Sequence, residues 1–421
     1  MMNQHSPAQP GIRKFLFNLT ACAGFAFICA CDSPHVHAES EPSETQIRSA
    51  AYANKRNGLM LDIARHYYSP QVVKQYIDTV AQSGGKFVHL HFSDNENYAL
   101  ESAVLNQRAK DAVFSDGIYT NPLTKRPFWS DEQLKDVVEH AKQKNIELIP
   151  EFGGPRHIKG VFDLLAEYKG KTYARELRSA QEDDEINITK PESVAFVKAM
   201  MGEIAAKFPY GRRFHIGGDE FGYSAESNHE FVRYANDMAA FLEKKGLKTQ
   251  MWNDGMMKSN LGDWNKNIEI TYWSYDGDPQ SKTERRRRRA MRASLPDLVK
   301  RGFKVWNYNS YYLYFVPKQN LAFSEDIDYA TRDVRKNWHL GVWDRYNFKN
   351  TADPAKIQGA AYAVWGEHAG KLSDRTIYAH TKGMLEAVMH KAGGKADWPS
   401  KTAKQGKTGN LLKTADKVRG R

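Results

Sequence analysis

Two adjacent acids end the segment of this chain that is best suited to chemistry. Residues 214–220 read Phe-His-Ile-Gly-Gly-Asp-Glu, an apolar run followed by two glycines and then by Asp219 and Glu220. The glycines allow a sharp turn and a close approach of other groups. Neighbouring carboxylates repel each other, which raises the pKa of one of them toward neutrality. A proton held in that range suits the general acid that breaks a glycosidic bond.

The adjacency of these two acids predicts a different catalytic role for each. Adjacent carboxylates approach a substrate from the same side, whereas the acids of common two-carboxylate glycosidases flank the bond. The pair therefore favours a nucleophile supplied by the substrate, the carbonyl oxygen of an N-acetyl group at C2 of the sugar. We expect Asp219 to hold and polarise the acetamide N–H. We expect Glu220 to protonate the leaving oxygen and then to act as a base toward water.

Aromatic residues at the ends of predicted strands support the same interpretation. Trp252, Trp273 and Trp365 occupy such positions, and indole rings bind the C–H faces of sugars by dispersion and apolar contact. Ordinary core packing explains any one of them, but three at one end of a barrel favour an apolar box. Residues 307–314 are rich in tyrosine, and one tyrosine O–H from this run could hold the acetamide oxygen.

Charged residues at other strand ends are candidates for gripping sugar hydroxyls. Arg65, Asp94 and Glu367 supply fixed charge there, and arginine can form bidentate hydrogen bonds. The alternative for Arg65 is a buried, purely structural ion-pair network. Both interpretations require these side chains to come from different strands of one barrel.

Histidines raise the alternative of a metal-dependent barrel hydrolase. His89 and His91 place two imidazoles on one face of a strand, a spacing that can bind zinc. Asp94, His157 and His215 could complete such a site. Histidines in polar barrels are more often hydrogen-bonded to acids, so we expect no metal and no other cofactor.

Eight short β-rich runs alternate with amphipathic helical patterns, which is typical of a parallel α/β sheet. The runs cover residues 58–65, 86–94, 146–152, 213–220, 248–255, 268–276, 304–309 and 359–367. The clearest helical patterns cover residues 70–82, 131–144, 191–207 and 228–245. Eight such units predict a single (β/α)8 barrel, an α/β fold whose active site lies at the carboxyl ends of its strands. A doubly wound sheet is the alternative, but no glycine-rich nucleotide fingerprint follows the first strand.

The N-terminal segment predicts export. Arg13 and Lys14 precede an apolar run that is too short for a comfortable membrane span, which is typical of a signal peptide over residues 1–38. A bacterial lipoprotein signal, in which Cys31 carries the lipid, is slightly favoured because Cys31 closes the apolar run. An uncleaved anchor is a further alternative. All three cysteines lie within the first 31 residues, so the rest of the chain has no thiol for a disulfide or a metal.

Composition divides the rest of the chain. Residues 39–55 are polar and predict a linker, residues 56–392 one catalytic domain, and residues 393–421 a basic, disordered tail. The formal charge is +11, but the last 31 residues hold nine basic against two acidic residues. That distribution weakens the case for a nucleic-acid groove. We interpret Arg285–Arg289 as a solvated helix face or loop, with a polyanion contact as the alternative.

The segment 215–220 resembles the His-x-Gly-Gly-Asp-Glu motif of glycoside hydrolase family 20, the β-N-acetylhexosaminidases, and matches it in full. Similar segments extend from about residue 58 to residue 390. The resemblance implies a barrel, a retaining substrate-assisted mechanism and no metal. It implies the roles already given to Asp219 and Glu220, and it singles out Tyr314 for the acetamide oxygen.

The resemblance also implies contacts with the terminal sugar, through Arg65 and Glu367. The predicted substrate-binding residues are Arg65, Asp94, His157, Tyr223, Trp252, Asp254, Trp273, Trp365 and Glu367. The implied substrate is poly-β-1,6-N-acetylglucosamine, a biofilm exopolysaccharide. The alternatives are a general exo-β-N-acetylhexosaminidase acting on chitin or peptidoglycan fragments, and a non-catalytic sugar-binding protein. We expect a monomer, secreted or in the cell envelope of a bacterium, with no nucleic-acid partner and membrane attachment only through Cys31.

One position departs from the family's pattern. Members usually carry an acid in the turn after the third strand, where this chain has Gly153. The change puts in doubt the role of that turn in orienting His157. A later acidic loop contains Asp183 and Asp184, which predicts a bias toward partly deacetylated, cationic polymer; a solvated loop is the alternative.

Overall fold

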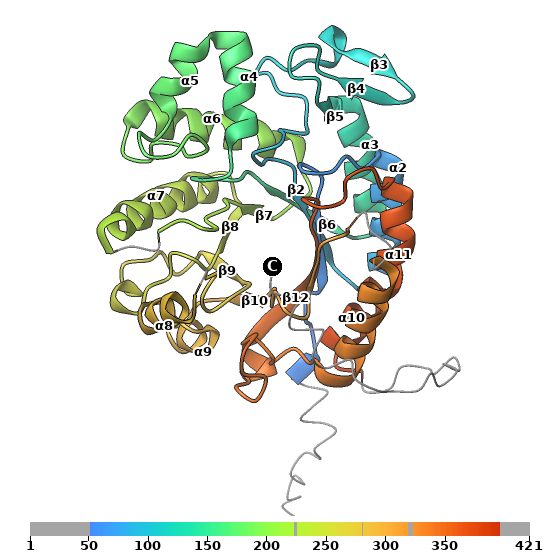
Figure 1. Ribbon diagram of the computed structural model, residues 1–421, viewed down its shortest axis with the longest axis vertical. Coiled ribbons are helices and arrows are strands. Elements are labelled where there is room, and N and C mark those ends of the chain that lie inside the picture. The colour runs from blue at the N-terminus through green and yellow to red at the C-terminus, as the bar shows by residue number, and fades with distance from the viewer. Residues whose placement is uncertain (1–50, 223–224, 280, 319–322, 396–421) are drawn as a thin grey trace, which may run out of the picture. The chain divides into compact units, whose positions relative to one another are not determined.

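Eight parallel strands close into a barrel in the computed structural model, which describes residues 51–222, 225–279, 281–318 and 323–395. The strands are β1 (Gly58–Asp62), β2 (Phe87–His91), β6 (Glu147–Glu151), β7 (Arg213–His215), β8 (Lys248–Trp252), β9 (Glu269–Tyr272), β10 (Val305–Asn307) and β12 (Ile357–Val364). They pair in this order, and β1 pairs with β12 to close the ring. Figure 1 shows the ring with helices outside it. The predicted barrel is confirmed. Seven of the predicted runs contain their strand, and the eighth, residues 359–367, overlaps β12, which begins two residues earlier.

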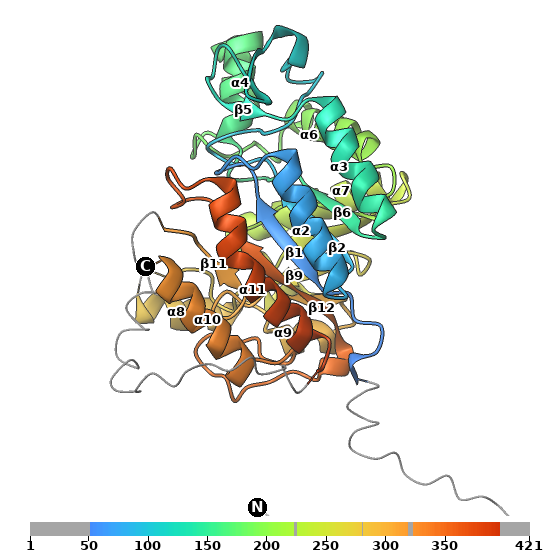
Figure 2. The same cartoon turned by 90° about the vertical axis from the view of Figure 1, so that its right-hand side faces the viewer.

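Helices cover the outside of the ring. They are α2 (Pro70–Gln82), α3 (Asp131–Gln143), α4 (Lys159–Lys169), α5 (Lys171–Leu177), α6 (Pro191–Lys207), α7 (Ala225–Glu243), α8 (Lys282–Met291), α9 (Leu295–Lys300), α10 (Phe323–Asn337) and α11 (Asp374–Ala392). Local signals begin them: the Ser69 side chain caps α2 ahead of Pro70, and Ser130 and Gln133 form a capping box on α3. Figure 2 shows α2 and α11 side by side, outside β1.

Two connections differ from the predicted pattern. Residues 92–130 hold a short helix, η1 (Ala109–Asp111), and a small antiparallel sheet of β3 (Val113–Ser115), β4 (Ile118–Thr120) and β5 (Pro127–Phe128). Strands this short carry too little periodicity to be predicted. Between β8 and β9, residues 253–268 hold only η2 (Lys258–Asn260), so the fifth unit lacks an α-helix. Gly255 and Gly262 disfavour one there.

Alternation along the strands builds two cores. On β2, Val88 and Leu90 belong to the core between barrel and helices, whereas Phe87 points into the barrel. The apolar cluster inside the barrel comprises Met60, Phe87, Ile149, Trp252, Trp306, Tyr308, Ala361, Ala363 and Trp365. Opposite faces of a strand carry alternate side chains, so His89 and His91 share the inner face with Phe87. The barrel interior is therefore packed, and polar groups enter it toward the carboxyl ends of the strands.

The seam between β1 and β12 tolerates no side chain at Gly359. A Cβ at Gly359 would meet the carbonyl oxygen of Arg56 at 1.7 Å. We predict that Gly359→Ala lowers the free energy of unfolding by about 2–3 kcal/mol, because two backbones would have to separate. Urea denaturation measures this. Gly383→Ala in α11 is the control: a Cβ there meets nothing within 4 Å, so a gain of about 0.5–1 kcal/mol is expected. An equal loss in both variants would contradict the prediction.

Candidate active site

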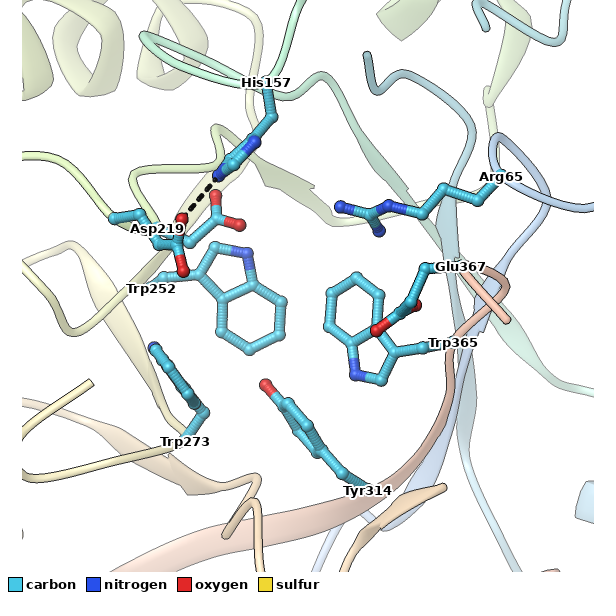
Figure 3. Close-up of a pocket in the computed structure, with 9 residues that line it drawn as sticks. Arg65, His157, Asp219, Trp252, Trp273, Tyr314, Trp365 and Glu367 are labelled. Atoms are coloured by element: carbon cyan, nitrogen blue, oxygen red, sulfur yellow. Dashed lines mark ion pairs between the residues drawn. The ribbon is translucent and has the colours of Figure 1, made fainter. Parts of the chain in front are cut away.

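A cavity of about 280 Å³ lies where the barrel strands end. This volume is near the lower end of the roughly 300–1,000 Å³ typical of small-molecule sites. Its lining side chains follow or end seven different strands: Arg65, His157, Asp219, Glu220, Trp252, Trp273, Tyr314, Trp365 and Glu367. Figure 3 shows them facing a common space. All nine are among the twelve residues predicted from the sequence.

The other three predicted residues lie elsewhere. Asp254 is fully buried behind the cavity wall, where it accepts a hydrogen bond from the Trp273 indole at 2.7 Å and pairs with Arg292 at 2.9 Å. Asp94 is also buried. Direct contact of these two carboxylates with a sugar, as predicted, does not fit their burial; they hold side chains that do reach the cavity. Tyr223 lies outside the described residues.

The turn after β7 has a conformation that most residues resist. Gly217 and Gly218 have φ values of 76° and 93°, and a Cβ on Gly217 would meet the backbone of Gly154 at 2.6 Å. Gly218 N–H donates to the Gly154 carbonyl at 2.7 Å. Glu220 itself has φ 53°, which is uncommon outside glycine. Such strain clusters at functional sites, and here it presents both Asp219 and Glu220 to one cavity.

Glu220 forms an ion pair with His157 across the cavity rim. The Nε2 atom of His157 lies 3.2 Å from Oε2 of Glu220, as the dashed line in Figure 3 marks. This hydrogen bond holds the pKa of Glu220 below its ordinary value. Although burial acts in the opposite direction, the same bond and the nearby charge of Asp219 raise the pKa of His157 to about 9. The shared proton therefore resides on the imidazole of His157.

Asp219 shows the opposite shift. Burial raises its pKa to about 7, and the carboxylate of Glu151 acts in the same direction, while His157 opposes it. The sequence predicts that repulsion between the two acids raises the pKa of the general acid, Glu220. That prediction is wrong: the raised carboxyl is Asp219, and burial is the main cause. The pKa of Glu220, the predicted proton donor, is lowered instead.

The far side of the His157 ring faces a polar pair. Its Nδ1 atom lies 3.4 Å from Nδ2 of Asn95 and 3.8 Å from Oδ2 of Asp184, and Asn95 donates to the same carboxylate at 3.1 Å. Asp184 therefore supplies an acid next to this imidazole, although Gly153 offers none. Arg156 lies 3.5 Å from Asp184. Because this charge is partnered inside the protein, Asp184 does not fit the predicted contact with a cationic polymer.

Arg65 is held by a group of carboxylates. Its guanidinium lies 3.0 Å from Asp62, 2.6 Å from Asp94 and 3.6 Å from Glu96. Burial alone would lower its pKa, but the charges of Asp62, Asp94 and Glu367 raise it above its ordinary value. The guanidinium also lies over the Trp365 ring, 5.2 Å from its centroid. Arg65 thus belongs to a buried ion-pair network and also lines the cavity. The two interpretations from the sequence, a structural ion pair and a group that binds sugar hydroxyls, are therefore compatible.

Aromatic rings form the remaining wall. Trp273 and Tyr314 are stacked, with centroids 6.1 Å apart and planes 8° from parallel, and Tyr314 lies 5.5 Å from Trp365. Burial, together with the nearby charge of Asp219, raises the pKa of Tyr314 well above its ordinary value. Its hydroxyl therefore remains a hydrogen-bond donor, as a partner for a carbonyl oxygen must be.

A buried carboxylate, Glu151, lies beneath the cavity. It receives the Trp252 indole N–H at 2.8 Å, and imidazole nitrogens of His91, His89 and His215 lie 2.6, 3.0 and 3.1 Å from it. Burial opposes ionisation, yet the charges of these histidines hold the pKa of Glu151 well below its ordinary value. The donor atoms of His89, Glu151 and His215 lie within 4.8 Å of one another, a spacing that a metal could use. In the structure Glu151 instead accepts hydrogen bonds.

The geometry agrees with the comparison with known families. Residues 56–390 match the catalytic domain of glycosyl hydrolase family 20. The chain belongs to this family. Among solved structures, dispersin B is 56% identical with a TM-score of 0.79, and the match covers 80% of this chain and 99% of that one. A family 20 β-N-acetylhexosaminidase from Streptomyces coelicolor, 20% identical with a TM-score of 0.55 over 80% of this chain and 64% of that one, shares the fold.

Curated relatives match over shorter stretches. The β-hexosaminidase of Vibrio furnissii is 28% identical over 39% of this chain and 29% of its own length. The human β-hexosaminidase subunit beta is 25% identical over 46% of this chain and 32% of its own length. The chain thus spans about a third of the length of these two relatives.

Sequence reasoning missed part of this family 20 site. The contacts of Glu151 and Asn95 join segments that are far apart along the chain, so no local sequence motif predicts them. One signal was available: alternation along β2 places His89 and His91 on the inner face with Phe87, where imidazoles need buried partners. The metal-binding alternative also drew on His157, which the structure pairs with Glu220 instead.

The paired proton predicts a pH effect. In the wild type, Glu220 and His157 share one proton, which stays on the pair until the pH reaches the pKa of His157, about 9. In His157→Gln that proton can reside only on Glu220, whose pKa returns toward the ordinary carboxyl range of about 4–5. We predict that the alkaline limb of the kcat/KM profile moves to lower pH by several units, measured on an aryl N-acetylglucosaminide. An unchanged alkaline limb would show that the pair does not hold the catalytic proton.

Proposed function

We propose that this chain is a β-N-acetylhexosaminidase that hydrolyses poly-β-1,6-N-acetylglucosamine, a biofilm exopolysaccharide, by substrate-assisted catalysis. The observation that carries the proposal is the adjacent pair Asp219 and Glu220 at a sugar-sized cavity walled by Trp252, Trp273 and Trp365. Family membership supports the reaction class. The choice of polymer rests on the resemblance to dispersin B along nearly the whole of that chain.

The first chemical step needs no enzymic nucleophile. The acetamide oxygen at C2 of the sugar attacks C1, forming an O–C1 bond, while the C1–O bond to the leaving sugar breaks and Glu220 gives its proton to that oxygen. Asp219 accepts a hydrogen bond from the acetamide N–H, and its negative charge stabilises the cyclic cation. Tyr314 donates its O–H to the acetamide oxygen and holds it in line. Water then attacks C1 from the side of the departed group and gives a proton to Glu220, while the bond between C1 and the acetamide oxygen breaks and the acetamide is restored, so configuration is retained.

Substrate binding changes the charges around the two acids. An acetamide N–H pointing at Asp219 favours the ionised carboxylate, which lowers the pKa of a group otherwise near 7. A charged Asp219 favours the protonated form of both neighbours, His157 and Glu220. The entering sugar displaces water, and a drier cavity disfavours the separated charges of the His157–Glu220 pair, so it favours transfer of the proton to Glu220. The pair thus supplies the proton that the leaving oxygen takes.

Arg65 and Glu367 complete the grip on the sugar. Both line the cavity, and Arg65 is fixed by buried carboxylates rather than free to swing. A rigid donor next to an acceptor suits the vicinal hydroxyls of a terminal sugar. Trp365 lies beneath Arg65 and offers its face to the sugar ring.

We also propose that the chain is exported as a monomer, through the signal over residues 1–38 or with a lipid on Cys31, and that residues 393–421 form a basic tail. These segments lie largely outside the described residues. Among the described residues, no helix has the length and apolar character needed to cross a membrane. The mass of the mature N-terminal peptide distinguishes the two forms of processing, and an intact residue 1 would exclude both.

Cleavage of defined oligomers tests the function. We predict that purified protein from residue 39 onward shortens β-1,6-linked N-acetylglucosamine oligomers, and that mass spectrometry detects single sugars or internal fragments. Glu220→Gln should lower kcat by about 10²–10⁴ on these substrates, and less on a substrate whose leaving group needs no proton. Cleavage of β-1,4-linked oligomers alone would favour the general hexosaminidase. Binding without cleavage of any linkage would favour the non-catalytic alternative.

Fluorination of the N-acyl group tests the mechanism. Successive fluorines weaken the acetamide oxygen as a nucleophile, so we predict that kcat/KM of aryl glycosides falls at each step, on the order of a hundredfold across the series. Aryl glycosides bearing the same leaving group keep the demand on Glu220 constant. A flat series would indicate a nucleophile from the protein and would remove the role given to the substrate.

A further inference from the structure

The arginine run lies in α8, which faces the carboxyl ends of the strands. Three of its arginines are paired with carboxylates: Arg287 and Arg288 with Glu284, and Arg289 with Asp276 and Asp344. The prediction of a solvated helix face therefore holds for only part of the run. The remaining two, Arg285 and Arg286, form no ion pair with any carboxylate of the residues that the structure describes.

One exposed ring gathers three of the nearby cations. Tyr346 is 47% exposed. The guanidinium carbons of Arg285, Arg345 and Arg289 lie 4.2, 5.0 and 5.3 Å from the centroid of its ring. Arg289 is neutralised by its carboxylates. Within the described ranges, Arg285 and Arg345 have no such partner. We call Arg285, Arg345 and Tyr346 the arginine clamp.

The clamp carries two uncompensated positive charges on a single ring. Each contact with the ring contributes about 0.5–1 kcal/mol at an exposed site, and the two like charges repel each other. An oxyanion between them would turn this repulsion into attraction, because guanidinium groups present planar forks that fit carboxylate and phosphate. The arrangement is thus incomplete without an anion.

Two neighbours of the clamp in α8 connect it to the turns around the catalytic cavity. Arg289, which shares the Tyr346 ring with the clamp, pairs with Asp276, three residues beyond the cavity residue Trp273. The charge of Arg288 contributes to lowering the pKa of Glu220. In the proposed mechanism Glu220 faces the leaving oxygen, so Arg288 lies on the side of the sugars beyond the scissile bond, and the clamp residue Arg285 follows from it along α8.

A second connection joins the clamp to the cavity wall. Phe348, two residues after Tyr346, packs against Tyr311 with centroids 4.9 Å apart. Tyr311 lies three residues before the cavity residue Tyr314. The segment that carries the exposed rings of Tyr346 and Phe348 is thus packed against the residues that lead into the cavity wall. Exposed aromatic rings there suit contact with a sugar polymer.

We propose that the arginine clamp binds an oxyanion, a carboxylate or a phosphate, carried by the glycan on the leaving-group side of the scissile bond. The site makes the enzyme prefer acid-bearing N-acetylglucosamine chains over neutral ones. This inference rests on the proposed function for its substrate, but the clamp itself stands on the contacts around Tyr346.

Two matched oligomers test the clamp. In both, a terminal N-acetylglucosamine is β-1,6-linked to glucosamine whose amine carries either an acetyl group or a succinyl group, which adds one carboxylate. We expect the wild-type kcat/KM ratio of succinyl to acetyl substrate to be about fivefold or more at about 20 mM salt and to approach 1 at about 500 mM. A third oligomer with a phosphate ester on the same sugar tells phosphate from carboxylate.

Variants locate the effect. Arg285→Gln with Arg345→Gln should bring the succinyl-to-acetyl ratio close to 1. The single variant Arg285→Gln should lower the ratio as well. Arg286→Gln is its matched control, since it removes one charge from the same helix without a contact to Tyr346, and it should keep the wild-type ratio. Thermal unfolding of each variant confirms that it is folded. An equal fall of the ratio in the control would overturn the clamp in favour of general surface charge.

Binding and turnover separate the two possible failures. If neither oligomer is cleaved, the proposed function fails, and the clamp is then judged by calorimetry alone: tighter binding of the succinyl oligomer to wild type but not to the double variant upholds it. If the neutral oligomer is cleaved and the wild-type ratio is 1 at low salt, the clamp is overturned. Competition by a short DNA duplex, with no preference between the oligomers, would overturn it in favour of nucleic-acid binding.

Discussion

A row of alternating charges inside the barrel supports the rest of the site. It runs from Glu151 through His91 and Asp94 to Arg65 and Asp62, with successive contacts of 2.6, 2.8, 2.6 and 3.0 Å. Both nitrogens of His91 face carboxylates, whose charges, although burial opposes them, raise its pKa well above the ordinary value. Removing one member of such a row leaves an uncompensated buried charge, which costs about 3–5 kcal/mol.

The row matters because it holds two tryptophans of the cavity wall. Glu151 accepts the Trp252 indole N–H and Arg65 lies over Trp365, and the two rings adjoin with centroids 6.2 Å apart. The two tryptophans come from different strands, and hydrophobic packing alone would allow them to slide. Directional hydrogen bonds to charged groups restrict that freedom. A cavity that must hold one sugar within a fraction of an ångström gains this precision from buried charge rather than from its apolar lining.

The parts that the sequence predicts well are those with local signals. Each barrel strand is a short apolar run between helical patterns, and the motif of residues 215–220 places the two acids in one turn. The parts that it misses depend on contacts between distant segments. Asp184 meets His157 only because the loop carrying it folds back, and Asp254 reads like a binding residue until burial shows that it holds Trp273. The small β3–β5 sheet has strands too short for any pattern.

The two catalytic acids illustrate why sequence adjacency does not give equal chemistry. Asp219 turns inward, where burial raises its pKa, whereas Glu220 meets His157 at the rim and is held ionised. The proposed reaction requires the reverse assignment, and an acetamide N–H facing Asp219 would change the environment of that carboxyl in this direction. A sugar without that group would leave the pKa of Asp219 raised and that of Glu220 lowered. In the proposed mechanism, specificity for N-acetylated sugars would therefore depend on the proton distribution as well as on the shape of the cavity.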